Sequence, residues 1–206
     1  MKANKFYYSL HIFLLVILVI FSGISCSASK SQTDAAAEED YKQIKNQASK
    51  EFPDELPSVA LFKSSQKKVI DQFAAEKDPA KRAKKAADIF MGFFFMGSRA
   101  FSDHCAEQNI DIKPFAVAFI TGHAEAHKKA ISILKYTPER EDGQYDLIQQ
   151  QMRGMAEQQI NDIATVNKTT TAGACDLIGS NADYLSAEMH ISKLQPVVYA
   201  ELMNAK

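Results

Sequence analysis

Two histidines lie four residues apart, at His123 and His127. Side chains at this spacing share one face of a helix, so the two imidazoles could hold one transition-metal ion. A third ligand would have to come from His104, from His190 or from a carboxylate on another helix. The order differs from the HExxH motif of zinc proteases, because Glu125 points away from the pair, so that mechanism is not predicted. The competing interpretation is a hydrogen-bonded, half-buried His123 and a solvated His127.

Ser64 and Lys67 match the S-x-x-K pattern of penicillin-recognising serine enzymes. Ser27 and Lys30 match it as well, which shows how easily the pattern arises. The S-D-N and K-T-G motifs of those enzymes are missing, and so are the G-x-S-x-G, G-x-G-x-x-G and P-loop patterns. The sequence therefore predicts neither an enzymatic activity nor a cofactor.

The first 25 residues have the form of an export signal. Lys2 and Lys5 give a positive start, residues 12–21 are all apolar, and small residues follow from Ser22. This arrangement is typical of a secretory signal peptide. Retention as an uncleaved anchor is an alternative, because residues 6–24 are nearly long enough to span a bilayer.

Cys26 directly follows the residues Gly-Ile-Ser at 23–25. Small residues just before a cysteine resemble the lipobox of bacterial lipoproteins, although that family usually has a branched residue in place of Gly23. The resemblance covers four residues and implies that Cys26 is lipidated and tethers the mature chain to the membrane. Residues 26–34 would then form a flexible polar tether. Ordinary cleavage near Ala28 is the alternative, which would leave the protein soluble in the periplasm or secreted.

The chain has three cysteines, and either processing route removes or modifies Cys26. The remaining two, Cys105 and Cys175, would reach a compartment in which disulfides form. We therefore predict a disulfide between them that joins two helices and closes a loop of about 70 residues. Two separate buried thiols are the alternative.

The densest apolar segment is residues 89–97, with the sequence Ile-Phe-Met-Gly-Phe-Phe-Phe-Met-Gly. A helix that is apolar on nearly all sides lies either in the centre of a bundle or along an apolar groove. In the second case Phe90, Phe93, Phe94 and Met96 form a candidate surface for a protein partner or a small apolar ligand.

Positive charge collects just before this segment, at Lys81, Arg82, Lys84 and Lys85. We call these four residues the basic patch. Its simple interpretation is a solvated helix face. Its functional interpretation is docking to anionic lipid headgroups or to an acidic partner.

Helices must position all these residues, because apolar residues recur at helical spacing and no useful strand pattern occurs. Asp78-Pro79 marks one helix start, since Asp caps helices and Pro suits the first helical position. The spacing predicts helices over about residues 35–52, 65–77, 79–108, 111–136 and 144–166, another from Thr171 to about His190, and a short last helix from Pro196. The fold class is therefore all-α, a single-domain antiparallel bundle of five or six helices over residues 35–206.

Removing residues 1–25 leaves 22 basic and 25 acidic residues, a net charge of −3. This balance argues against nucleic acid as a partner, because phosphate binding needs a basic excess. We expect a non-enzymatic protein on the periplasmic side of a bacterial cell envelope that binds a protein partner in an accessory, inhibitor or immunity-type role. The alternatives are a metal-binding module through His123 and His127, and a carrier of a small apolar ligand.

Overall fold

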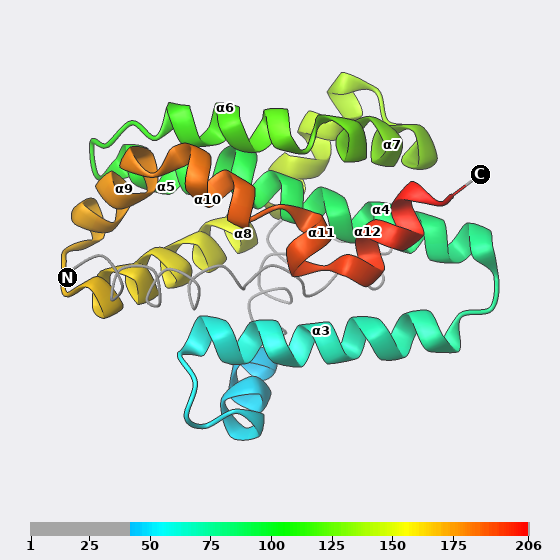
Figure 1. Ribbon diagram of the computed structural model, residues 1–206, viewed down its shortest axis with the longest axis horizontal. Helices are drawn as coiled ribbons and strands as arrows, with labels where there is room; N and C mark the ends of the chain where they lie inside the picture. Colours follow the sequence, from blue (N-terminus) through cyan, green and yellow to red (C-terminus); the bar gives the residue numbers. More distant parts are fainter. Residues whose placement is uncertain (1–41, 206) are drawn as a thin grey trace.

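The computed structural model describes residues 42–205, which form helices joined by short connections (Figure 1). No β-strand occurs in this part of the chain, so the predicted all-α class is confirmed. The predicted export signal at 1–25, the tether at 26–34 with Cys26, and residues 35–41 and 206 lie outside the described residues. Within the described range, no helix is both long and apolar enough to cross a bilayer.

The helices follow one another closely along the chain. After a helix over residues 42–51 come α3 (Pro57–Ala75), α4 (Pro79–Phe95), the π-helical segment η1 (Met96–Ala100), α5 (Phe101–Glu107), α6 (Lys113–Gly122), α7 (Ala124–Leu134), α8 (Pro138–Asn167), α9 (Thr171–Ser180), α10 (Ala182–Glu188), α11 (Ile191–Leu194) and α12 (Pro196–Met203). Because α4, η1 and α5 join without interruption, they correspond to the single helix predicted over residues 79–108.

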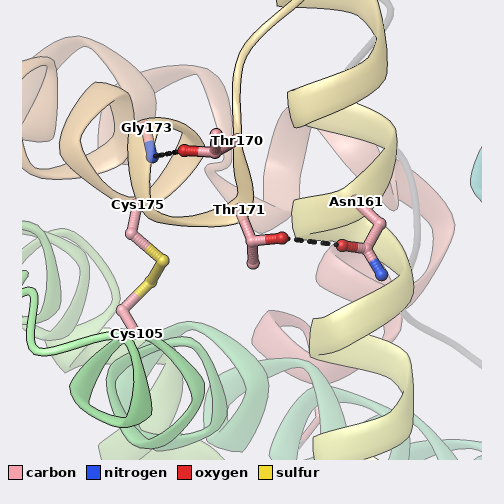
Figure 2. The surroundings of a disulfide bond; sticks show 6 residues. All are labelled: Cys105, Asn161, Thr170, Thr171, Gly173 and Cys175. Atoms are coloured by element: carbon pink, nitrogen blue, oxygen red, sulfur yellow. Dashed lines mark hydrogen bonds between the residues drawn. A yellow bond between two sulfur atoms is a disulfide. The ribbon is translucent and has the colours of Figure 1, made fainter.

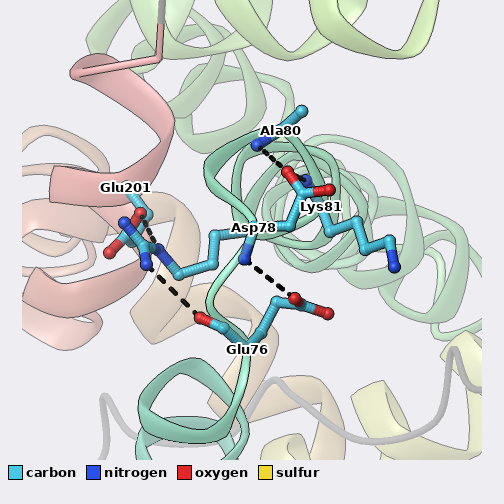
Figure 3. A network of polar contacts seen from close by, with 6 residues as sticks. Glu76, Asp78, Ala80, Lys81 and Glu201 are labelled. Carbon is cyan, nitrogen blue, oxygen red and sulfur yellow. Dashed lines mark hydrogen bonds and ion pairs between the residues drawn. The ribbon is translucent and has the colours of Figure 1, made fainter.

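Prolines and capping side chains set several of the helix starts. Asp78 caps α4 as predicted, and its Oδ1 accepts a hydrogen bond from the backbone N–H of Ala80 at 2.8 Å (Figure 3). The helix predicted to begin at residue 65 begins instead at Pro57. Proline is compatible with the first position of a helix, where its missing N–H would have no helical partner. Pro57 therefore starts α3 rather than ending the helix before it.

Two predicted helices are each divided in the structure, at His123 and at Asn181. His123 Nδ1 donates to the carbonyl of Phe119 at 2.8 Å, and Asn181 Nδ2 donates to the carbonyl of Leu177 at 2.8 Å. Both side chains thus bond to the carbonyl four residues earlier and compete with the regular helical pattern. The predictions of unbroken helices over 111–136 and 171–190 are corrected on this point.

The core is built around α4. This helix packs against α7 and α12, while α10 packs on α6 and α9 on α8 (Figure 1). Residues 89–97 of α4 and η1 are all buried. Close packing also explains Gly97, because a Cβ added there would lie 2.4 Å from the ring of Phe119. The most apolar segment of the sequence therefore supplies the centre of the fold.

A disulfide connects α5 to α9 (Figure 2). The sulfur atoms of Cys105 and Cys175 are 2.08 Å apart, and both residues are fully buried. Next to it, the Thr170 hydroxyl accepts a hydrogen bond from the N–H of Gly173 at 3.1 Å and caps α9. This is the cysteine pairing predicted from the sequence. The bond joins α9 to the end of the long helix formed by α4, η1 and α5.

Candidate functional site

His123 is fully buried at the junction between α6 and α7. Its Nδ1 donates to the carbonyl of Phe119, and its Nε2 accepts a hydrogen bond from the backbone N–H of Ile191 at 3.0 Å. Burial lowers the pKa of His123 from its ordinary value of 6.5 to about 4, while the bond to Phe119 acts in the opposite direction. His123 is therefore a neutral side chain at pH 7 that ties the α6–α7 junction to the start of α11.

His190 strengthens the same connection from the other side. Its ring stacks on that of His123, with centroids 4.8 Å apart. Its Nε2 lies 3.2 Å from the carbonyl of Gly122, and its Nδ1 lies 2.7 Å from the hydroxyl of Ser192. The two histidines together hold the connection between α10 and α11 against the end of α6. Sequence reasoning named His190 only as a possible metal ligand and missed this structural pairing.

His127 lies apart from this arrangement. Its Nε2 is 2.9 Å from Glu141 Oε1, and its ring stacks on Phe94 with centroids 4.2 Å apart. His127 is thus half-buried rather than solvated. Since both ring nitrogens of His123 are already hydrogen-bonded, the predicted metal site at His123 and His127 is not supported by the geometry. Among residues 42–205, no group of three His, Cys, Asp or Glu side chains is placed to hold a metal ion.

The Phe-rich segment is not a surface. Phe90, Phe93, Phe94 and Met96 have exposed fractions of 0%, 1%, 4% and 0%. The three phenylalanine rings pack against one another and against Phe119, His123 and His127. The prediction that these four side chains meet a partner or an apolar ligand is therefore corrected: the core of the protein itself covers them.

One residue of the basic patch, Arg82, makes an ion pair, and the other three do not share it. The Arg82 guanidinium lies 3.1 Å from Glu201 of α12 and also donates to the backbone carbonyl of Glu76 at 3.3 Å; these partners are labelled in Figure 3. Arg82 therefore connects α4 to α12 and to the end of α3. Lys81 and Lys84 are exposed and Lys85 is half-buried, so three cations of the predicted patch remain at the surface.

Ser64 and Lys67, the S-x-x-K pair, both bond to Glu51. The serine hydroxyl and the lysine ammonium each lie 3.1 Å from one of its carboxylate oxygens. The hydrogen bond to Glu51 raises the pKa of Lys67, which keeps the amine protonated. A protonated lysine cannot act as a base toward serine, so this pair is a surface contact between α3 and the helix before it.

The π-helical segment carries a polar network that the sequence did not suggest. Arg99 pairs with Asp142 at 2.6 Å, and its guanidinium lies 5.1 Å from the centre of the Tyr145 ring. The Tyr145 hydroxyl donates to Asp103 at 2.6 Å, and burial followed by this bond raises the pKa of the phenol. The phenol therefore stays protonated, and the network joins η1 and α5 to α8.

The outer face of α6 and α7 is a further feature that the sequence analysis missed. Val117 and Ile120, one helical turn apart, have exposed fractions of 52% and 42%. Lys113, Ala124 and Lys128 continue the same exposed face, and we call these five residues the α6–α7 stripe. Helical spacing from 113 to 128 was the signal available in the sequence.

The other large apolar side chains exposed within residues 42–205 are isolated, one on each of three helices: Ile70, Leu147 and Val197. Single exposed apolar residues are normal on a protein surface. Val117 and Ile120 differ from them because they lie next to each other. The α6–α7 stripe is therefore the best candidate functional surface of the described chain.

Comparison with known proteins gives no family for this chain. No protein-family model, no curated protein and no solved structure matches it. What the observations define is a class: an all-helical domain with a buried disulfide between two of its helices.

Proposed function

We propose that this chain is an exported protein of the bacterial cell envelope that works by binding a protein partner. A lipid on Cys26 would hold it at the periplasmic side of the membrane. An accessory, inhibitor or immunity-type role fits a small helical domain of this kind.

The disulfide is the observation that carries the proposal. Cys105 and Cys175 are buried together and lie 70 residues apart in sequence. Bonds of this kind persist in secreted and periplasmic proteins and are rare in the reducing cytosol. An N-terminal segment with a positive start and an apolar stretch leads to the same compartment by an independent route.

The side chains that could have been reactive are already bonded to other parts of the protein, which supports a binding function over a catalytic one. His123 has both ring nitrogens bonded to the backbone, and Lys67 is paired with Glu51. General bases and nucleophiles need a free lone pair directed at a substrate. These side chains instead stabilise the contacts between helices.

Export and tethering are tested by mass spectrometry on the protein purified from the membrane fraction of its host, with and without reductant. We expect a mature chain that begins at Cys26, carries acyl chains and is two hydrogens lighter than its reduced form. A Cys26→Ala variant should lose the acyl mass and leave the membrane fraction in its cleaved form. An unprocessed chain with free thiols in the cytosol would refute the proposal.

Partner binding is tested separately, by lysine-directed crosslinking in intact cells followed by purification of the chain. We expect one protein of the envelope to be enriched over a control culture that expresses an unrelated lipoprotein. Recovery of the uncrosslinked chain alone would contradict a binding function.

A further inference from the structure

We propose that His123 and His190 form a pH-sensitive switch at the start of α11, and that their protonation releases residues 191–203 from the rest of the domain. These residues comprise α11 and α12, the last two helices of the described chain, and α12 packs against α4 (Figure 1). The inference goes beyond the proposed binding function and does not depend on it.

Two imidazole lone pairs accept the first two backbone N–H groups of α11. The N–H of Ile191 donates to His123 Nε2 at 3.0 Å. The N–H of Ser192 donates to His190 Nδ1 at 3.3 Å. The first N–H groups of a helix have no partner inside it, and a protonated imidazole cannot accept them because it carries hydrogen on both nitrogens. Protonation therefore breaks both bonds at the start of α11.

The other nitrogen of each ring bonds to α6 and keeps its bond on protonation. His123 Nδ1 donates to the carbonyl of Phe119 at 2.8 Å. His190 Nε2 donates to the carbonyl of Gly122 at 3.2 Å. A charged imidazole donates to a carbonyl at least as well as a neutral one, whereas the N-terminus of α11 is the positive end of its helix dipole. The charge is thus compatible with α6 and incompatible with α11, so the break falls between His190 and α11.

The described surroundings of the two rings supply no negative charge to offset protonation. Within residues 42–205, no acidic side chain bonds to either ring, and Glu188 of α10 is paired with Lys193 at 2.9 Å. The two rings stack with centroids 4.8 Å apart, so positive charges on both repel each other. The side chains that face the rings from α4, α6 and α12 are aromatic and carry no charge in acid: Phe90, Phe93, Phe119 and Tyr199.

The pH range follows from proton uptake on release. Burial lowers the pKa of His123 to about 4 while α11 is in place, against 6.5 for an exposed ring. Above pH 6.5 the ring is neutral in both the attached and the released state, so the balance between them does not change. Between pH 6.5 and 4 only the released state binds the proton, so release becomes more favourable as the pH falls.

The disulfide confines the release to the end of the chain. It joins α5 to α9, and α10 packs on α6, so the chain as far as α10 stays attached when α11 leaves. Beyond α10, noncovalent contacts hold the segment, among them the buried side chains of Val198 and Leu202 and the ion pair of Arg82 with Glu201. Helices of 4 and 8 residues are too short to persist alone in water, so the released segment unfolds and α4 loses the cover of α12.

The test is hydrogen exchange measured by mass spectrometry on the full chain with its disulfide intact, at pH 7.5 and 4.5, corrected for the pH dependence of intrinsic exchange. We expect the protection factors of residues 191–203 to fall roughly tenfold or more between these pH values. At pH 4.5 they should also lie roughly tenfold or more below those of α5 and α9, because the segment opens while the rest stays folded.

A double variant assigns the effect to the two rings. His123→Gln and His190→Asn each keep an oxygen that can accept the N–H of α11, and neither side chain titrates. Protection of residues 191–203 in this variant should change less than about threefold between the two pH values. The matched control, His127→Gln, removes the histidine that bonds to Glu141 instead and should behave as the wild type.

Equal protection of residues 191–203, α5 and α9 at pH 4.5 would overturn the inference, because acid would then only unfold the whole domain. A double variant that loses protection as the wild type does would overturn it as well. If circular dichroism shows that the double variant does not fold at pH 7.5, His190→Asn alone replaces it. That variant should reduce the loss of protection, and an unchanged loss would contradict the switch.

Discussion

Acidification should destabilise this protein mainly through His123. The buried ring has a pKa of about 4 in the folded protein, against 6.5 when it is exposed in the unfolded chain. Above pH 6.5 the ring is neutral in both states and has no effect on their balance. Between pH 6.5 and 4 the unfolded chain takes up a proton and the folded protein does not. The free energy of unfolding must therefore fall as the pH falls through this range.

The size of the effect follows from the difference in pKa. A difference of about 2.5 units between folded and unfolded states corresponds to about 3 kcal/mol, and most of it is lost by pH 4.5. The loss is a large fraction of the stability of a domain of this size. Asp88 acts in the opposite direction, because burial raises the pKa of its carboxyl group. A variant that changes only His123 keeps the contribution of Asp88 and isolates that of the histidine.

The assay is urea unfolding followed by circular dichroism at 222 nm, at pH 7.5, 6.0, 5.0 and 4.5, for the wild type and for His123→Gln. Glutamine does not titrate, and its side-chain amide takes the position of the histidine Nε2, where its Oε1 can accept from the N–H of Ile191. We expect the variant to be less stable at pH 7.5 but to lose about 2.5 kcal/mol less than the wild type between pH 7.5 and 4.5. Parallel pH profiles for the two proteins would refute the assignment of the pH dependence to His123.

Three further outcomes test the packing. Reduction of the disulfide should lower the free energy of unfolding by about 4 kcal/mol, the chain-entropy value for a loop of its length, measured by urea unfolding with and without reductant. Gly97→Ala should destabilise by about 1–3 kcal/mol, because the new Cβ meets the Phe119 ring, whereas Gly154→Ala in the open middle of α8 should stabilise by up to about 1 kcal/mol. Equal thermal unfolding temperatures for the two glycine variants would contradict this packing. Asp78→Ala should cost about 1 kcal/mol by removing the cap of α4, and a loss near zero in chemical unfolding would show that the cap is dispensable.

Local signals in the sequence were enough for the fold class and for some helix starts. Asp78 and Pro79 predict the start of α4 because capping depends on residues next to one another in the chain. The pairing of Cys105 with Cys175 followed from the number of cysteines once an export signal was predicted. Neither inference needed knowledge of how distant segments pack.

The candidate site was harder to predict, because exposure depends on contacts between distant segments. His123 receives its second hydrogen bond from Ile191, 68 residues further along the chain. Because of that bond, both ring nitrogens of His123 are occupied and the side chain has a structural role. The spacing between His123 and His127 does not predict this bond. Conversely, Val117 and Phe119 are both apolar residues of one helix, and only the packing of α6 on its neighbours shows that the first is exposed and the second buried.

The residues that most resembled a reactive site are the ones this fold uses for its own assembly. A histidine between two backbone partners and a lysine held by a glutamate lose the freedom that chemistry on a substrate requires. The opposite holds for Val117 and Ile120, whose side chains are chemically inert and gain nothing from their exposure to water. Among the described residues, the side chains that first suggested chemistry are therefore part of the packing between helices, and those of Val117 and Ile120 are not.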